Sequence, residues 1–168
     1  MLWAKVPAQQ WQIVSKEMVV STLLNAFGPA GIIFALNLTP PERLIGPNDV
    51  IAALVHAAGL ATFAMTLILT YIVRKRVAAG TLPIFDWPQS QRGLYRYVPR
   101  HLILRALVLA VVAIILLVPF GLGITALLNI APLSKLGFLL FNVAFGAVIG
   151  LVMTHFIVLC ALADPVNA

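Results

Sequence analysis

Three kinds of side chain in this sequence could do chemistry: histidine imidazoles, asparagine amides and arginine guanidinium groups, all in or beside long apolar stretches. They are His56 and His155, Asn25 and Asn142, and Arg96, Arg100 and Arg105. An imidazole can ligate the metal of a haem or a chlorophyll-type pigment, and an amide can hydrogen-bond between two membrane helices. Guanidinium groups pair bidentately with phosphate. Cofactor binding, helix packing and lipid headgroup binding are therefore the chemistries to test.

The depth of the two histidines bears on whether they could share one haem. In the membrane arrangement argued below, His56 lies about seven residues from the outer surface and His155 about eighteen, roughly 16 Å apart at 1.5 Å per residue. Both ligands of one iron must lie close to it, so one shared haem is not expected. We expect each histidine to hydrogen-bond to a neighbouring helix. The alternative is a haem or pigment held by His56 or His155 singly.

Patterns for catalysis are missing from the sequence. The apolar stretches contain no paired carboxylates, and the chain has no Cys-x-x-Cys, no metal-ligand spacing of His, Cys and acids, and no glycine-rich phosphate loop. The single cysteine, Cys160, cannot form an internal disulfide. We therefore expect no enzyme activity, no bound metal and no resident cofactor.

The composition shows what surrounds most of the chain. Of its 168 residues, 62% are hydrophobic and 10% charged, whereas soluble domains have roughly 45–50% and 25%. A soluble domain of this size could not bury so much apolar surface, so the excess must face lipid. The formal charge of +6 would suggest nucleic acid in a soluble protein. Here the basic residues cluster beside apolar stretches, which favours anionic lipid headgroups instead.

Four stretches are long enough to cross a membrane, which takes about 20 helical residues. They are about 18–36, 49–73, 102–128 and 137–163, and loops with proline or asparagine separate the first from the second and the third from the fourth. We expect the first to be retained rather than cleaved as a signal peptide. The predicted fold is all-α: a single transmembrane domain over 1–168, with four helices in an antiparallel bundle.

The basic residues predict the orientation of this bundle. Nine of the eleven lysines and arginines lie in the N-terminal arm, in the loop 74–101 or just beyond it, and two lie in the other loops. By the positive-inside rule, the N-terminus, the loop 74–101 and the C-terminus are cytoplasmic. Arg96, Arg100 and Arg105 then lie where the third span begins. They are predicted to bind an anionic lipid headgroup or, alternatively, only to fix the topology.

The ends of the first and third spans suggest an internal repeat. Residues 27–40 and 120–132 share Phe-Gly, then Gly-Ile, then Leu-Asn-x-x-Pro, and Met65-Thr66 and Met153-Thr154 are a weaker echo. This favours two tandem helical hairpins related as a parallel repeat, although apolar segments also align by chance. Pro29 and Pro119 should kink the two related helices, either as structural bends or around a transporter site.

Small residues indicate where helices approach closely in lipid. Gly146 and Gly150 form a GxxxG pattern in the fourth span. We expect it to contact another helix of the same chain or, alternatively, a partner. Asn25 and Asn142 are expected to help hold the helices together.

Residues 98–107 (VPRHLILRAL), together with Gly146, Gly150 and the closing Ala161-Leu162-Ala163-Asp164, carry a resemblance to a known group. This chain resembles an uncharacterised family of small four-span bacterial inner-membrane proteins. The resemblance implies a multi-pass protein of the bacterial inner membrane and carries over no activity to any residue.

The sequence thus predicts a non-catalytic membrane protein: an accessory or scaffold subunit that packs against a larger membrane complex, with lipids and other membrane subunits or itself as partners and no nucleic acid. A second hypothesis is a small oligomeric transporter or lipid-handling protein. A third is a haem- or pigment-bearing subunit that uses a single histidine ligand.

Overall fold

The computed structural model describes residues 45–82, 97–127 and 132–164, with ten further residues between 12 and 27. This described part is helical and has no β-strand; one isolated antiparallel bridge joins Ile45 to Leu133. Most of the predicted first span lies outside the described residues, as do Asn25, Pro29 and Arg96. The all-α prediction is confirmed for the part that is described.

One continuous helix of 32 residues, Pro47–Ala78, corresponds to the predicted second span. It consists of α2 (Pro47–His56), a π-helical turn η1 (Ala57–Ala61) and α3 (Thr62–Ala78). Proline suits the first helical position because its missing N–H has no partner there in any case. The Asp49 carboxylate accepts a hydrogen bond from the Gly46 N–H at 3.1 Å, which satisfies another free donor at this helix end.

The helix α3 continues five residues past its predicted end and so includes the basic run at 74–76. It ends at Ala78, two residues before Gly80, whose φ of +70° is readily adopted by glycine and seldom by other residues. The chain then folds back, and the Thr81 hydroxyl donates to the Arg76 carbonyl at 2.8 Å. Part of the predicted loop 74–101 is thus helix.

The third and fourth predicted spans appear as α4 (Leu102–Leu127) and α5 (Lys135–Leu162), within two residues of their predicted bounds. The hydroxyl of Ser134 caps α5 by accepting from the Gly137 N–H at 3.1 Å. Pro119 lies inside α4, and the helix continues beyond it to Leu127. The chain therefore has three helices in its described part that are long and apolar enough to cross a membrane.

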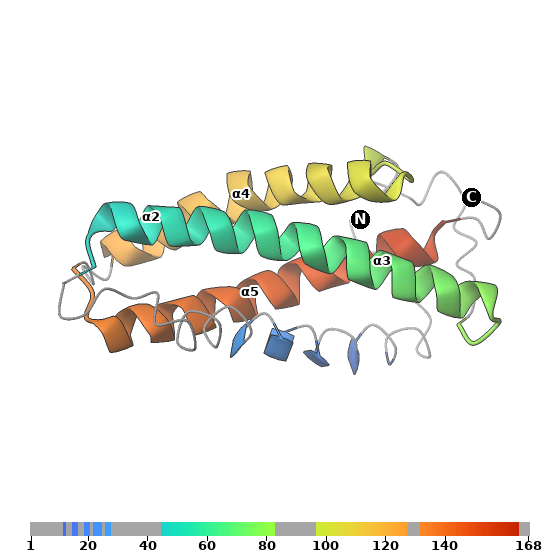
Figure 1. The fold of residues 1–168 in the computed structure, drawn as a ribbon, viewed down its shortest axis with the longest axis horizontal. Helices are drawn as coiled ribbons and strands as arrows, with labels where there is room; N and C mark the ends of the chain where they lie inside the picture. Colours follow the sequence, from blue (N-terminus) through green and yellow to red (C-terminus); the bar gives the residue numbers. More distant parts are fainter. Residues whose placement is uncertain are drawn as a thin grey trace.

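The long helices lie side by side along one axis (Figure 1). α3 packs against both α4 and α5, and α4 also packs against η1. In its most apolar stretch, α5 has 61% of its residues buried, against 28% for Pro47–Ala78 and 33% for α4. The helix α5 is therefore the most buried of the three, while Pro47–Ala78 and α4 each leave most of their apolar stretch exposed.

Small residues on α4 allow this close packing. Its inner face carries Ala106, Ala110, Ala113 and Gly121, all of them buried. A Cβ added to Gly121 would lie 2.9 Å from the Leu54 side chain and 3.1 Å from Phe145. Three helices thus meet at this glycine.

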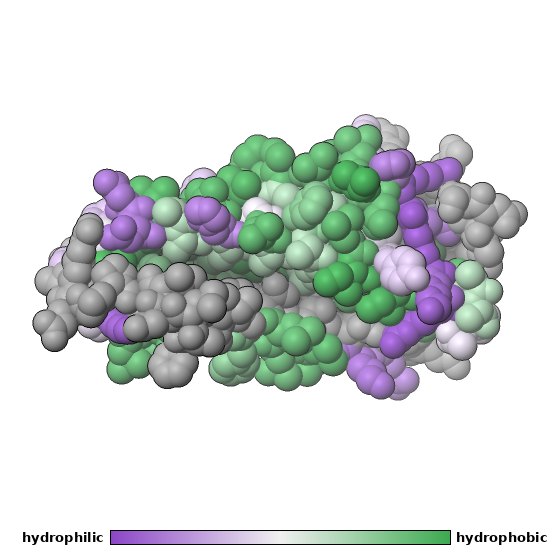
Figure 2. All heavy atoms as spheres, in the orientation of Figure 1, coloured by the Kyte–Doolittle hydropathy of each residue, from purple (hydrophilic) through white to green (hydrophobic). Residues whose placement is uncertain are grey.

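The outer surface is apolar between two polar ends. Figure 2 shows hydrophobic residues over the middle of the molecule and hydrophilic residues near both ends of its long axis. On α4 the large exposed apolar side chains are Ile103, Leu104, Leu107, Val111, Val112, Ile115, Leu116, Phe120 and Leu127. An apolar surface of this extent is unusual for a soluble monomer. With the three apolar helices, it indicates a membrane-embedded protein.

Candidate functional site

A buried cluster of three charged residues joins the helices at one end of the molecule. Arg105 lies in the first turn of α4, Arg74 near the end of α3, and Asp164 just after α5. The Arg105 guanidinium donates to both carboxylate oxygens of Asp164, at 2.8 and 2.7 Å. The Nε of Arg74 donates to the same carboxylate at 2.9 Å. One carboxylate therefore binds two guanidinium groups from two different helices.

Backbone carbonyls accept the other N–H groups of this cluster. The Nε of Arg105 donates to the Pro99 carbonyl at 2.9 Å, and Arg74 donates to the Arg100 carbonyl. These bonds fix the segment that leads into α4. Arg105 is 1% exposed and Asp164 6%, while the Arg74 side chain is 28% exposed. The cluster carries one net positive charge, which the carbonyl dipoles partly offset.

This geometry corrects the prediction for Arg105. We predicted that Arg105 binds a lipid headgroup, but its guanidinium is buried and bound to Asp164. Arg100 is exposed, and Arg96 lies outside the described residues. The sequence did contain a signal: Arg74, Arg105 and Asp164 all lie where predicted spans meet the cytoplasmic side, so their charges fall at a similar depth.

The two histidines lie in different environments. His56 is exposed, and its Nδ1 is 2.7 Å from the Ala52 carbonyl of the same helix. The predicted hydrogen bond to another helix is not seen among the residues that the structure describes. His155 is buried in α5, with its ring edge-on to Phe156. Among the residues the structure describes, no group of three or more His, Cys, Asp or Glu could hold a metal ion. The single-histidine haem or pigment hypothesis stays a prediction.

The predicted packing residues of α5 lie in the interior. Gly146 and Gly150 are buried, as is Asn142. The Asn142 amide donates to the Phe138 carbonyl at 2.9 Å, a bond within its own helix.

The two Met-Thr pairs noted in the sequence meet between helices. The Thr154 hydroxyl on α5 donates to the Met65 sulfur on α3 at 3.4 Å, and Thr66 and Met153 are buried as well. The structure thus brings together two parts of the proposed repeat. Whether they derive from a repeat stays a prediction, because residues 28–44 lie outside the described part.

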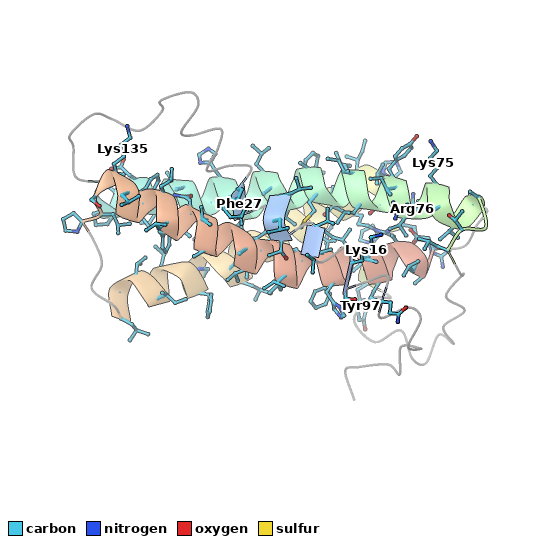
Figure 3. All side chains as sticks on the ribbon, turned by 90° about the horizontal axis from the view of Figure 1, so that it is seen from below. Lys16, Phe27, Lys75, Arg76, Tyr97 and Lys135 are labelled. Atoms are coloured by element: carbon cyan, nitrogen blue, oxygen red, sulfur yellow. The ribbon has the colours of Figure 1, made fainter. Side chains whose placement is uncertain are left out.

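A second feature lies at the same end of the molecule: a groove of about 730 Å³ around the last turns of α3. We call it the basic groove. Its lining residues are Lys16, Tyr71, Ile72, Lys75, Arg76, Ala79, Thr81 and Leu82. Figure 3 shows Lys16, Lys75 and Arg76 at the same end, with Lys135 at the opposite end. The sequence analysis missed this groove because Lys16 and Lys75 are far apart in the chain.

Comparison of the chain with family models, curated proteins and solved structures finds no match.

Proposed function

We propose that this chain is a non-catalytic, four-span membrane protein with an antiparallel helical bundle, and that it serves as an accessory or scaffold subunit of a larger membrane complex. The proposed location is the bacterial inner membrane, with both termini and the basic loop cytoplasmic. The observation that carries the proposal is the Arg74–Asp164–Arg105 cluster. The buried charges of this cluster bind one another and so join the helices, and they do not serve to bind a ligand.

Four other polar groups support the same conclusion. His56, Thr66, Thr125 and Asn142 each hydrogen-bond to a backbone carbonyl three or four residues earlier in their own helix. A transport path needs intramembrane polar groups that face a substrate or a coupled ion. Polar side chains that hydrogen-bond to their own helix do not face a substrate, and they are compatible with a bundle that has one stable arrangement of its helices.

The outer face of α4 is the surface that we propose for the partner. It is exposed and apolar, and Leu107 and Val111 are about half exposed there. In a membrane, apolar contact alone gives little net gain because lipid tails are equally apolar. A partner must therefore fit this face by shape, and a bulky substitution should disrupt the fit.

Affinity purification of the tagged chain in a mild detergent, followed by mass spectrometry, tests the proposal. We expect one membrane protein in a fixed ratio to this chain, and we expect Val111→Trp to abolish its recovery. The matched control is Leu140→Trp, which changes an exposed leucine on α5 and should retain the partner. Gel filtration confirms that each variant is folded.

Two outcomes would contradict this function. One is a chain that purifies without any partner in a fixed ratio. The other is solute uptake by proteoliposomes that contain this chain alone, which would favour a transporter.

A labelling experiment tests the proposed orientation separately. Cys160 is buried and should not react with the reagent. The labelling of a new cysteine at exposed Lys75 or Ser134 can therefore be measured without a background signal. A membrane-impermeant thiol reagent added to intact cells should label Ser134→Cys and leave Lys75→Cys unlabelled. The reverse pattern would overturn the orientation.

A further inference from the structure

We propose that the basic groove binds the headgroup of an anionic phospholipid, with the lipid phosphate between Lys16, Lys75 and Arg76. The acyl chains would lie along the exposed face of α3. This site is distinct from the one predicted at Arg96, Arg100 and Arg105, and it does not depend on the scaffold function.

Charge is the first argument. Among the residues that the structure describes, the lining includes three cationic side chains and no acidic one. Two of them, Lys75 and Arg76, lie in the last turn of α3, where the helix dipole favours positive charge. The neighbouring Arg74 is bound to Asp164, so the basic run 74–76 divides between the ion cluster and the groove. A phosphate in the groove would meet cations from two separate parts of the chain.

The surface beside the groove indicates a lipid rather than a free phosphate. Ala64, Ile68, Tyr71 and Lys75 are all exposed on α3, and their spacing of four, three and four residues places them on one helix face. Ile68 is 58% exposed and Tyr71 61%. This face is apolar for about 10 Å, from Ala64 to Tyr71 at 1.5 Å per residue, and ends at a lysine.

Tyr71 lies at the junction of the apolar face and the cations. Tyrosine is enriched at the headgroup level of membranes because it has an apolar ring and a polar hydroxyl. Its place in the groove lining suits contact with the glycerol region of a phospholipid. The order along the face, from aliphatic to tyrosine to lysine, matches the order from acyl chain to glycerol to phosphate.

Native mass spectrometry of the purified full chain tests this site by titration with phosphatidylglycerol or with zwitterionic phosphatidylcholine of the same acyl chains. We expect phosphatidylglycerol to bind at least about tenfold more tightly, since each basic residue of the groove adds attraction to an anionic headgroup. The double variant Lys16→Gln, Lys75→Gln should lose most of this preference. Lys135→Gln removes one charge at the opposite end and should keep it.

Three results would overturn the proposal. They are equal affinity for the two lipids, a double variant that retains the preference of the unchanged chain, or a Lys135→Gln variant that loses as much as the double variant. A titration with glycerol phosphate separates headgroup from lipid: binding as tight as that of phosphatidylglycerol would refute the role of the α3 face. The double variant changes exposed side chains, and its unfolding profile in detergent should match that of the unchanged chain.

Discussion

Replacing Asp164 by asparagine tests the ion cluster most directly. The change keeps the size of the side chain and removes the negative charge that Arg74 and Arg105 share. An amide oxygen in the place of Oδ2 could still accept from both arginines, but the NH₂ group in the place of Oδ1 would then face a donor N–H of Arg105. Arg105, which is 1% exposed, would then be a buried cation without a counter-ion.

The expected cost follows from the burial of each partner. Leaving one member of a buried ion pair uncompensated costs about 3–5 kcal/mol, and we expect Asp164→Asn to lower the free energy of unfolding by this amount. Arg74→Gln should cost only about 1 kcal/mol, because the Arg74 side chain is 28% exposed and Asp164 keeps its bidentate partner. The double variant Arg105→Leu, Asp164→Leu should be more stable than Asp164→Asn, because it leaves no fully buried charge unpaired.

Unfolding by a denaturing detergent, titrated against a mild one and followed by far-UV circular dichroism, measures these differences. Asp49→Asn is the matched control, because Asp49 is an exposed acid whose contact with the Gly46 N–H an amide oxygen can keep. If Asp164→Asn costs no more than Asp49→Asn, the cluster does not hold the helices together. A double variant less stable than Asp164→Asn would also refute the reasoning.

The same assay checks predictions at five other positions. Gly121→Ala should lower the free energy of unfolding by about 1–2 kcal/mol through overpacking, because its Cβ would meet two other helices within 3.1 Å. Gly123→Ala is the control and should not change the free energy of unfolding, because there is open space around its Cβ. Gly80→Ala should lower the free energy of unfolding by about 1 kcal/mol, because alanine seldom adopts the positive φ of this position. Gly80→Asn should lower it less, because asparagine tolerates this conformation. Equal losses for the two variants would contradict this reasoning. Thr70→Val should match or exceed the stability of the unchanged chain by up to about 1 kcal/mol, because the buried Thr70 hydroxyl has no hydrogen-bond partner among the described residues; a clear loss would show that it has one. His56→Leu should leave stability unchanged, because His56 is exposed and its hydrogen bond stays within one turn of its own helix; a large loss would indicate a contact with another part of the chain.

The helices were predictable from the sequence because their signal is local. Apolar stretches of sufficient length gave α4 and α5 within two residues. The end of α3 was misplaced because charged residues at 74–76 were read as loop, whereas lysine and arginine are good helix formers. The actual end is set by Gly80, whose positive φ stops the helix.

The candidate sites were harder to predict because they depend on which face of a helix each residue occupies. Arg105 could be read as a surface cation until its contact with Asp164, 59 residues later, was known. The basic groove similarly needs Lys16 beside the end of α3. A single sequence gives the period of each helix, but it does not give the rotation of one helix relative to another.

The order of the three charges along the chain has a consequence for biogenesis. Asp164 follows Arg105 by 59 residues and Arg74 by 90, so the ribosome makes both cations well before their shared anion. During synthesis, α3 and α4 must reach the bilayer with these guanidinium groups still hydrated at its surface. They can dock tightly only when α5 arrives and delivers the carboxylate. Of these three helices, the one translated after the other two thus closes their assembly.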